Sequence, residues 1–203
     1  MIKNLKLVSF LRQTYYKQTN MEISSGKLLI ATPELLMDHI FNQSVLLLTE
    51  HNDKGSMAFT VNKPLALRLN DIFEDIPANI QLWNGGPVET GNMFYIHNKP
   101  DLIPFSIPFD AKKNLHIGGD FEVIKKLLQD KIIDDRHIKF FLGYSGWAPG
   151  QLAREIKEKA WFVTPNDIDL FRVNPKDVWK EKIVSVNPNN IIWKNAPLNP
   201  HLN

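Results

Sequence analysis

Ser145 has the surroundings in which a hydrolase would place its nucleophile. It lies in "GYSGW", after an apolar run and before a helix-like segment. A nucleophile elbow has the order Gly-x-Ser-x-Gly, because both glycines relieve crowding at a strained turn. Here the second glycine, Gly146, directly follows the serine, and the bulky Trp147 takes the fifth position. We therefore expect a tight strand-to-helix corner, in which Gly143 and Gly146 take unusual dihedrals, Trp147 fills the core and Pro149 begins the helix.

Two other glycine-rich turns could present backbone N–H groups to a phosphate. They are "NGGPVETG" at 84–91 and "IGGDFEV" at 117–123. Neither has the spacing of a P-loop or of a dinucleotide fingerprint, and Asp120 in the second turn would repel an anion. We expect ordinary turns and no nucleotide cofactor.

The histidines do not form a metal-binding pattern. His97, His116 and His137 occur singly, without an H-x-x-x-H or H-x-H pair, and the chain has no cysteine. No metal site is predicted.

Gln151 and Glu155 share one face of a predicted helix, next to an apolar stripe of that helix. They could edge a pocket. Glu155 also precedes Lys159 by four residues, which is typical of an exposed ion pair on a helix. Both interpretations stay open at this point.

Alternating strand-like and helix-like segments must position these groups. Patterning predicts strands at 27–33, 44–51, 56–64, 80–88, 92–98, 114–117, 137–144 and 161–165, with a hairpin turn at 52–55. It predicts helices at 67–76, from 121 with Asp120 as N-cap, at 148–160, and one or two short ones within 166–183. Residues 187–203, rich in Asn and Pro, are expected to be irregular. This alternation indicates an α/β or α+β domain.

Composition allows one domain with a substantial core. The 203 residues are 43% hydrophobic and 23% charged, as in ordinary globular proteins. No apolar run approaches the roughly 20 residues that a membrane span needs, so none is predicted. Residues 1–21 carry four basic residues and no acid, which leaves residues 22–203 at a net charge of −2. That balance does not favour binding to a nucleic-acid backbone.

Residues 1–20 form an N-terminal extension of uncertain role. Their apolar residues are interrupted by Lys6, Ser9 and Arg12, and no cleavage site of small residues follows, so a secretory signal is not predicted. We expect that this extension is dispensable for folding. Met21 is a candidate start, and the sequence does not decide whether it is the true one.

Several segments together resemble one protein family. They are "GKLLIATPELLMDHIFNQSVLLLTEH" at 26–51, "VNKP" at 61–64, "NGGPVETGNMFYIH" at 84–97 and "FLGYSGWAPGQLAREI" at 141–156. In this order they resemble the AlgH (YqgE) family of largely uncharacterised bacterial proteins. Ala58 stands where the family pattern usually has glycine, which suggests local repacking. The resemblance implies a single domain over 21–203, including the C-terminal tail. It also implies a branched, partly barrel-like mixed β-sheet surrounded by helices.

The resemblance also carries over the family's signature positions. They are His51, Asn62, Gly85, Gly86, Pro87, His97, Gly143, Tyr144, Gly146, Trp147, Gly150, Gln151 and Glu155. From these and Ser145 we assemble a candidate pocket of Asn62, Gly85, Gly86, Pro87, His97, Tyr144, Ser145, Gly146, Trp147, Gln151 and Glu155.

The preferred hypothesis for function is a non-catalytic cytoplasmic domain that has a regulatory role or senses a small ligand. Some family members carry a transcriptional-regulator label, and an indirect effect on transcription through a protein partner fits it. The alternative is a hydrolase-like enzyme that uses His97 or Glu155 as acid or base. Sequence-specific DNA binding is not expected, because the helix from residue 121 is followed by a turn and a strand rather than a recognition helix. The ligand and the protein partner are not identified by the sequence.

Overall fold

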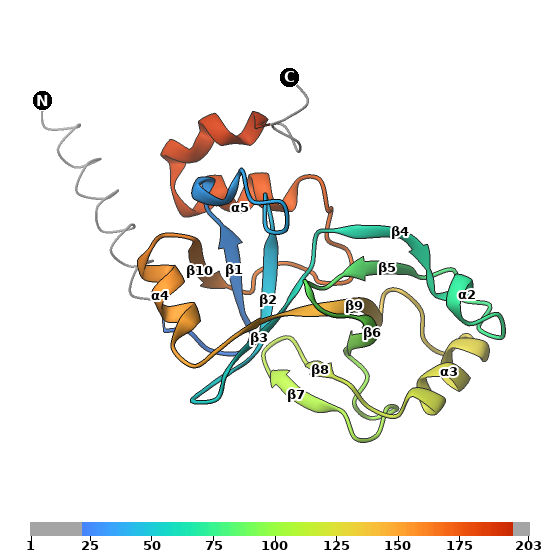
Figure 1. The fold of residues 1–203 in the computed structure, drawn as a ribbon. Coiled ribbons are helices and arrows are strands. Elements are labelled where there is room, and N and C mark those ends of the chain that lie inside the picture. Colours follow the sequence, from blue (N-terminus) through green and yellow to red (C-terminus); the bar gives the residue numbers. More distant parts are fainter. Residues whose placement is uncertain (1–21, 197–203) are drawn as a thin grey trace, which may run out of the picture.

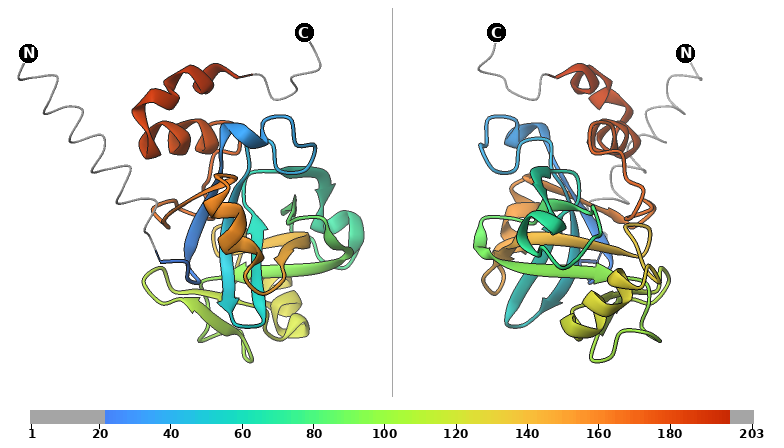
Figure 2. Two further views of the ribbon diagram at one scale, coloured as in Figure 1. Left: turned by 60° about the vertical axis from the view of Figure 1, so that its left-hand side comes forward. Right: turned by 90° about the vertical axis from the view of Figure 1, so that its right-hand side faces the viewer.

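A computed structural model describes residues 22–196 of the chain, and ten strands in this range form one sheet (Figure 1). The main strand order is β10-β1-β2-β3-β9-β6-β8-β7, with β5 beside β9 and β4 beside β5. The sheet curls into a half-barrel with helices around it, as two further views show (Figure 2). This is a single mixed α/β domain, which confirms the predicted fold class.

The strands are β1 Lys27–Ala31, β2 Val45–Asn52, β3 Gly55–Thr60, β4 Pro64–Arg68, β5 Gln81–Asn84, β6 Val88–His97, β7 Ile107–Asp110, β8 Leu115–Ile117, β9 Ile138–Trp147 and β10 Trp161–Pro165. The α-helices are α2 Leu69–Ile72, α3 Phe121–Gln129, α4 Gln151–Lys157 and α5 Val178–Val186. Two 3₁₀ helices complete the fold, η1 Pro33–Leu35 and η2 Pro188–Asn195. None of the helices within residues 22–196 is long and apolar enough to cross a membrane.

The continuous apolar runs of β1 and β2 follow from burial on both faces of the sheet. Leu28 and Ile30 face one hydrophobic cluster, which is covered by α5, whereas Leu29 and Ala31 face another, which is covered by α4. The indole N–H of Trp179 on α5 donates to the carbonyl of Ala31 at 2.8 Å, which fixes α5 against β1. A third cluster packs α2 and α3 on the far part of the sheet (Figure 1).

The sheet branches at β9, which lies at its centre. On one edge β9 pairs antiparallel with β6. On the other edge, residues 140–142 pair in parallel with β5 and residues 145–147 pair antiparallel with β3. Gly85 lies at the branch point, where its carbonyl accepts from Thr60 and its N–H donates to Leu142. Two strands therefore share one edge of β9, which gives the branched mixed sheet that the family resemblance implied.

The N-cap of α3 is formed as predicted, since the Asp120 carboxylate accepts from the N–H groups of Glu122 and Val123. The β2–β3 hairpin and the strands at β8, β9 and β10 also agree with the prediction. The predictions for residues 1–20 and for Met21 concern residues outside the described range.

Several predicted elements were wrong. The helix predicted at 67–76 is a single turn, because its first residues end β4, whose side chains alternate between half-buried and exposed. Residues 143–147 are not a corner, because β9 runs straight through them. The helix after them begins at Gln151, with Gly150 rather than Pro149 at its start. Of the one or two helices predicted within 166–183, one is formed, as α5, while residues 166–177 form turns. A 3₁₀ helix occupies part of the tail that was expected to be irregular.

Candidate functional site

An open groove of about 430 Å³ lies where the β2–β3 hairpin meets β9 and the start of β6. Its lining residues are Glu50, Asn52, Lys54, Gly55, Ser56, Met57, Val88, Tyr144, Gly146 and Trp147. Three of them, Tyr144, Gly146 and Trp147, belong to the predicted pocket. The hairpin residues were missed, because only the antiparallel pairing of β3 with the end of β9 brings them there.

The groove combines an aromatic and thioether floor with a polar rim. Tyr144 packs edge-to-face on Phe94, with ring centroids 5.5 Å apart, so its ring is held while its hydroxyl stays available. Within residues 22–196, neither that hydroxyl nor the ammonium of Lys54 has a hydrogen-bond partner. The Glu50 carboxylate accepts from the amide of Asn52 at 2.6 Å. The rim therefore offers two free donors and one carboxylate to a bound molecule.

A Ser–His pair lies beside the groove, on the exposed part of the hairpin. Nδ1 of His51 lies 2.7 Å from Oγ of Ser56, its cross-strand neighbour. A nucleophilic serine needs a base within this distance, but it also needs an orienting group on the base. No such group bonds His51 in the described part of the chain, so the pair does not form a triad there.

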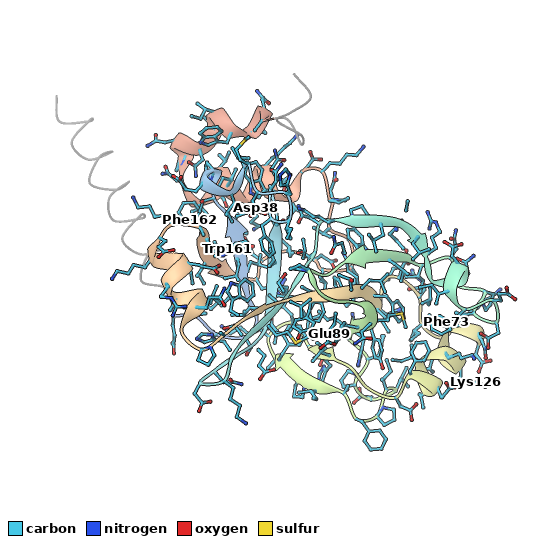
Figure 3. All side chains as sticks on the ribbon, in the orientation of Figure 1. Asp38, Phe73, Glu89, Lys126, Trp161 and Phe162 are labelled. Atoms are coloured by element: carbon cyan, nitrogen blue, oxygen red, sulfur yellow. The ribbon has the colours of Figure 1, made fainter. Side chains whose placement is uncertain are left out.

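On the face of the sheet covered by α4, the half-buried carboxylate of Glu155 is held in a cage of hydrogen bonds that includes the Trp147 ring. One oxygen of Glu155 accepts from the indole N–H groups of Trp147 and Trp161, at 2.8 and 2.9 Å. Its other oxygen accepts from the amide of Gln151 at 2.9 Å, and the Gln151 carbonyl in turn accepts from the N–H of Ala148. Figure 3 shows Trp161 on β10 beside α4. Glu155 thus fixes α4 to the sheet, and no ion pair with Lys159 is formed.

The segment with Gly85 and Gly86 and the segment 143–145 form the two sides of a crossing between two stretches of backbone. Because β5 and β6 lie on opposite edges of β9, the chain between them must pass over β9. It does so in direct contact: a Cβ on Gly86 would lie 2.3 Å from the carbonyl carbon of Tyr144, and one on Gly143 would lie 2.6 Å from the Gly86 oxygen. Both glycines have positive φ, at 154° and 68°. Only residues without a side chain fit this crossing.

Ser145 belongs to the same crossing and not to the groove. It is 1% exposed, and its hydroxyl donates to the carbonyl of Gly85 at 3.4 Å. Gly146 follows without a positive φ, which corrects the expected dihedral. Pro87 is exposed just after the crossing.

Asn62 fixes the loop before β2. Its carbonyl oxygen accepts from the N–H of Val45 at 2.9 Å and its amide donates to the carbonyl of Gln43 at 2.9 Å. Asn62 is 8% exposed, and both ends of its amide are engaged with the backbone.

His97 is fully buried at the far end of the sheet. Nε2 lies 3.1 Å from the Gly118 carbonyl and Nδ1 accepts from the N–H of Lys99, an arrangement that suits the neutral Nε2–H tautomer. Burial, opposed by the bond to Gly118 and aided by the neighbouring His116, lowers the pKa of His97 to about 4. The ring is therefore neutral at physiological pH.

The candidate residues consequently fall into separate places. His97 pairs with Ile138 at the start of β9, nine residues and about 30 Å along the strand from Trp147. Asn62, Gly85, Gly86 and Ser145 serve packing and backbone contacts. Gln151 and Glu155 lie behind Trp147. Tyr144, Gly146 and Trp147 remain in the groove. No group of three or more His, Asp or Glu side chains that could hold a metal occurs within 22–196.

The fold and this site define a small half-barrel protein with an open groove and, near it, a half-buried carboxylate held by two indoles. The chain belongs to the AlgH-like family, whose sequence profile matches residues 28–190. It is 39% identical to a UPF0301 protein of Bacteroides thetaiotaomicron over 190 residues, which cover 92% of this chain and 95% of that one. A UPF0301 protein of Cytophaga hutchinsonii is 35% identical, with 89% and 100% covered.

Solved structures agree on the fold. The solution structure of the AlgH protein from Pseudomonas aeruginosa has a TM-score of 0.67 at 26% identity, covering 87% of this chain and 98% of that one. A crystal structure of a Corynebacterium diphtheriae protein has a TM-score of 0.62 at 23% identity, covering 81% and 88%.

Proposed function

We propose that this protein is a non-catalytic, cytoplasmic ligand-sensing domain that binds a small molecule in the groove and influences transcription only indirectly, through a protein partner. The observation that carries the proposal is the groove itself. Its volume of about 430 Å³ is in the range of small-molecule sites, and its lining includes the apolar and aromatic residues Met57, Val88 and Tyr144. The free donors of Lys54 and Tyr144 suit a ligand that carries a carboxylate or another anionic group.

Trp147 provides a route by which an occupied groove could reach a partner. Trp147 borders the groove, while its ring packs on the opposite face of the sheet, in the cluster covered by α4, and its indole N–H donates to Glu155, which fixes α4. A ligand that displaces this end of β9 would change how α4 sits on the sheet, and α4 exposes Ala153, Arg154 and Lys157 to a partner. Coupling of this kind requires that the ligand bind the two arrangements with different affinity.

The alternative enzyme function is less favoured. An acid or base must reach a substrate proton. Both nitrogens of His97 and both oxygens of Glu155 are already engaged inside the protein.

The proposal is tested by ligand screening on the full chain. We expect compounds from a metabolite library to shift the NMR resonances of the Tyr144 and Trp147 backbone amides. For each hit, Lys54→Gln and Tyr144→Phe should weaken binding by about tenfold, the loss of one charge-assisted or one neutral hydrogen bond. Lys157→Gln, the same change at another exposed lysine, on α4, should have no effect.

A library that shifts no groove resonance would contradict ligand sensing. If the protein converted a hit compound, and Lys54→Gln and Tyr144→Phe converted it at the wild-type rate, the reaction would take place outside the groove. We also expect no sequence-specific duplex binding at physiological salt, and tight, salt-resistant binding to one DNA sequence would contradict the indirect role.

A further inference from the structure

The two charges that line the groove lie at one end of it, on the β2–β3 hairpin. Glu50 supplies the only carboxylate among the lining residues, and Lys54 supplies the only ammonium. Both belong to this hairpin, yet the ion pairs formed within residues 22–196 do not include one between them. Two opposite charges that border one groove without neutralising each other are the complement of a molecule that carries both signs.

Asn52 fixes the way in which the hairpin presents these charges. Its amide donates to one oxygen of the Glu50 carboxylate at 2.6 Å, and its carbonyl oxygen accepts from the backbone N–H of Lys54 at 2.8 Å, as in an Asx turn. The other oxygen of the Glu50 carboxylate has no hydrogen-bond partner among the described residues. Glu50 therefore keeps one acceptor for a ligand ammonium, and the Lys54 ammonium is available for a carboxylate.

An apolar strip continues from this charged end across the sheet. The strand register places Glu50 on β2 opposite Met57 on β3, and Met57 opposite Gly146 on β9. Residues opposite one another in paired strands direct their side chains to the same face. Because neighbouring strands lie about 4.8 Å apart, the backbones at Glu50 and Gly146 are separated by about 10 Å, with the Met57 side chain between them. The charged end is thus followed by about two strand widths of apolar surface.

Tyr144 closes the far side of this strip. It lies two residues before Gly146 on β9 and so faces the same way, with Val88 of β6 opposite it. Gly146 has no positive φ, so its backbone does not require a glycine, but a Cβ there would lie 3.1 Å from Cε2 of Tyr144. The missing side chain lets the edge of the ring next to the hydroxyl lie over Gly146. The hydroxyl is therefore directed along β9 towards the level of Met57, where it can bond a ligand.

We propose, on the basis of the ligand-sensing function proposed above, that the groove takes an α-amino acid with an apolar side chain. The ammonium of the ligand binds Glu50 and its carboxylate binds Lys54, while its side chain lies on Met57, towards Val88 and Tyr144. An α-amino acid carries both charges on one carbon, so both fit the charged end while the rest of the molecule stays apolar. A phosphate ester or a dicarboxylate would meet Glu50 as a like charge, and a diamine would meet Lys54 in the same way.

The first test removes one charge of the ligand at a time. The full chain is titrated with L-phenylalanine and with L-leucine while the Tyr144 and Trp147 backbone amides are followed by NMR. 3-Phenylpropionate and 4-methylpentanoate lack only the ammonium of these amino acids, and 2-phenylethylamine and 3-methylbutylamine lack only the carboxylate. Each analogue should bind at least about tenfold more weakly than its amino acid, because it loses one hydrogen bond between charged groups.

The second test removes one charge of the protein at a time. Glu50→Gln keeps an oxygen that can accept from Asn52, and should weaken L-phenylalanine binding about tenfold without changing the affinity for 3-phenylpropionate. Lys54→Gln should weaken binding of L-phenylalanine and 3-phenylpropionate without changing the affinity for 2-phenylethylamine. Glu158→Gln and Lys157→Gln, the same changes at exposed positions near the end of α4, should affect no probe. Damage to the fold would weaken all three probes alike, so the crossed pattern separates binding from structure.

Three results would contradict an amino-acid ligand. Equal affinity for L-phenylalanine and 3-phenylpropionate, unchanged in Glu50→Gln, would make the groove a site for anions. If neither amino acid shifts the groove amides but a compound of the metabolite library does, the amino-acid specificity is wrong and ligand sensing stands. If no compound of either set shifts these amides, ligand sensing itself is wrong, and the amino-acid ligand is excluded with it.

Discussion

Removal of the Glu155 carboxylate should destabilise the fold because it leaves two buried indoles without an acceptor. Trp147 is 7% exposed and Trp161 is 2% exposed, so water cannot easily replace the carboxylate. An unsatisfied buried donor costs about 1–3 kcal/mol. For the two indole N–H groups, with partial relaxation, Glu155→Ala should lower the free energy of unfolding by about 2–4 kcal/mol.

Glu155→Gln separates the charge from the hydrogen bonds. Its carbonyl oxygen can still accept from both indoles, but its NH₂ would face the donating amide of Gln151. We expect a loss of about 1 kcal/mol, near the cost of one hydrogen bond. Glu158→Ala, at an exposed position on the same helix end, should stay within about 0.5 kcal/mol of wild type.

Urea unfolding of the four proteins, followed by fluorescence and by circular dichroism, measures these differences. The structural role of Glu155 is refuted if the free energy of unfolding of Glu155→Ala lies within about 0.5 kcal/mol of the wild-type value. A catalytic acid or base would show that behaviour, with stability kept or improved.

Three further predictions concern the crossing, Ser145 and the buried Lys139. Gly86→Ala should prevent folding, because its Cβ would lie 2.3 Å from backbone, whereas Gly91→Ala, whose Cβ would meet nothing within 4 Å, should give normal soluble yield and circular dichroism. Ser145→Ala should cost at most about 1 kcal/mol, and the native protein should not react with a serine-directed probe; stoichiometric labelling at Ser145 would count against the packing role. The pKa of Lys139 is about 7 in the folded protein and near 10.5 in the unfolded chain, so the unfolded chain binds more protons between these two pH values. The free energy of unfolding of the wild type should therefore rise with pH across this window, by up to about 1.4 kcal/mol per pH unit. Lys139→Met should lack that slope in urea unfolding at pH 7, 8 and 9, and a parallel slope in both proteins would contradict the lowered pKa.

Local patterns were sufficient where neighbours in sequence determine the structure. The β2–β3 hairpin follows from two β-rich runs around a turn cluster, and the N-cap of α3 follows from one aspartate before an apolar stripe. The helix predicted at 67–76 failed because the same leucines also fit a strand of period two. The strand forms because it pairs with β5, and this pairing cannot be read from the local sequence pattern.

The candidate site was only partly predictable, for a similar reason. The motif around Tyr144 indicated one wall of the groove, but the wall from Glu50 to Met57 depends on the pairing of β3 with β9. Lys139 carried a signal that was overlooked: a lone charge inside a strand otherwise apolar enough to be central. Its partners Val61, Trp83 and Leu170 are too distant in sequence to be inferred from it.

The crossing and the groove share residues, and this determines which substitutions can probe function. Tyr144 contributes its backbone to the contact with Gly86 and its ring to the groove, so a change that moves the backbone alters both at once. A loss of activity or binding in a Gly143 or Gly86 variant would therefore report a displaced strand and not a binding residue. Changes limited to side-chain tips avoid this difficulty, because Tyr144→Phe keeps the ring on Phe94 and removes only the free hydroxyl. Lys54→Gln likewise alters a side chain that the described fold leaves unpaired. A phenotype shared by these two variants, with unchanged stability, would locate function in the groove even before the ligand is known.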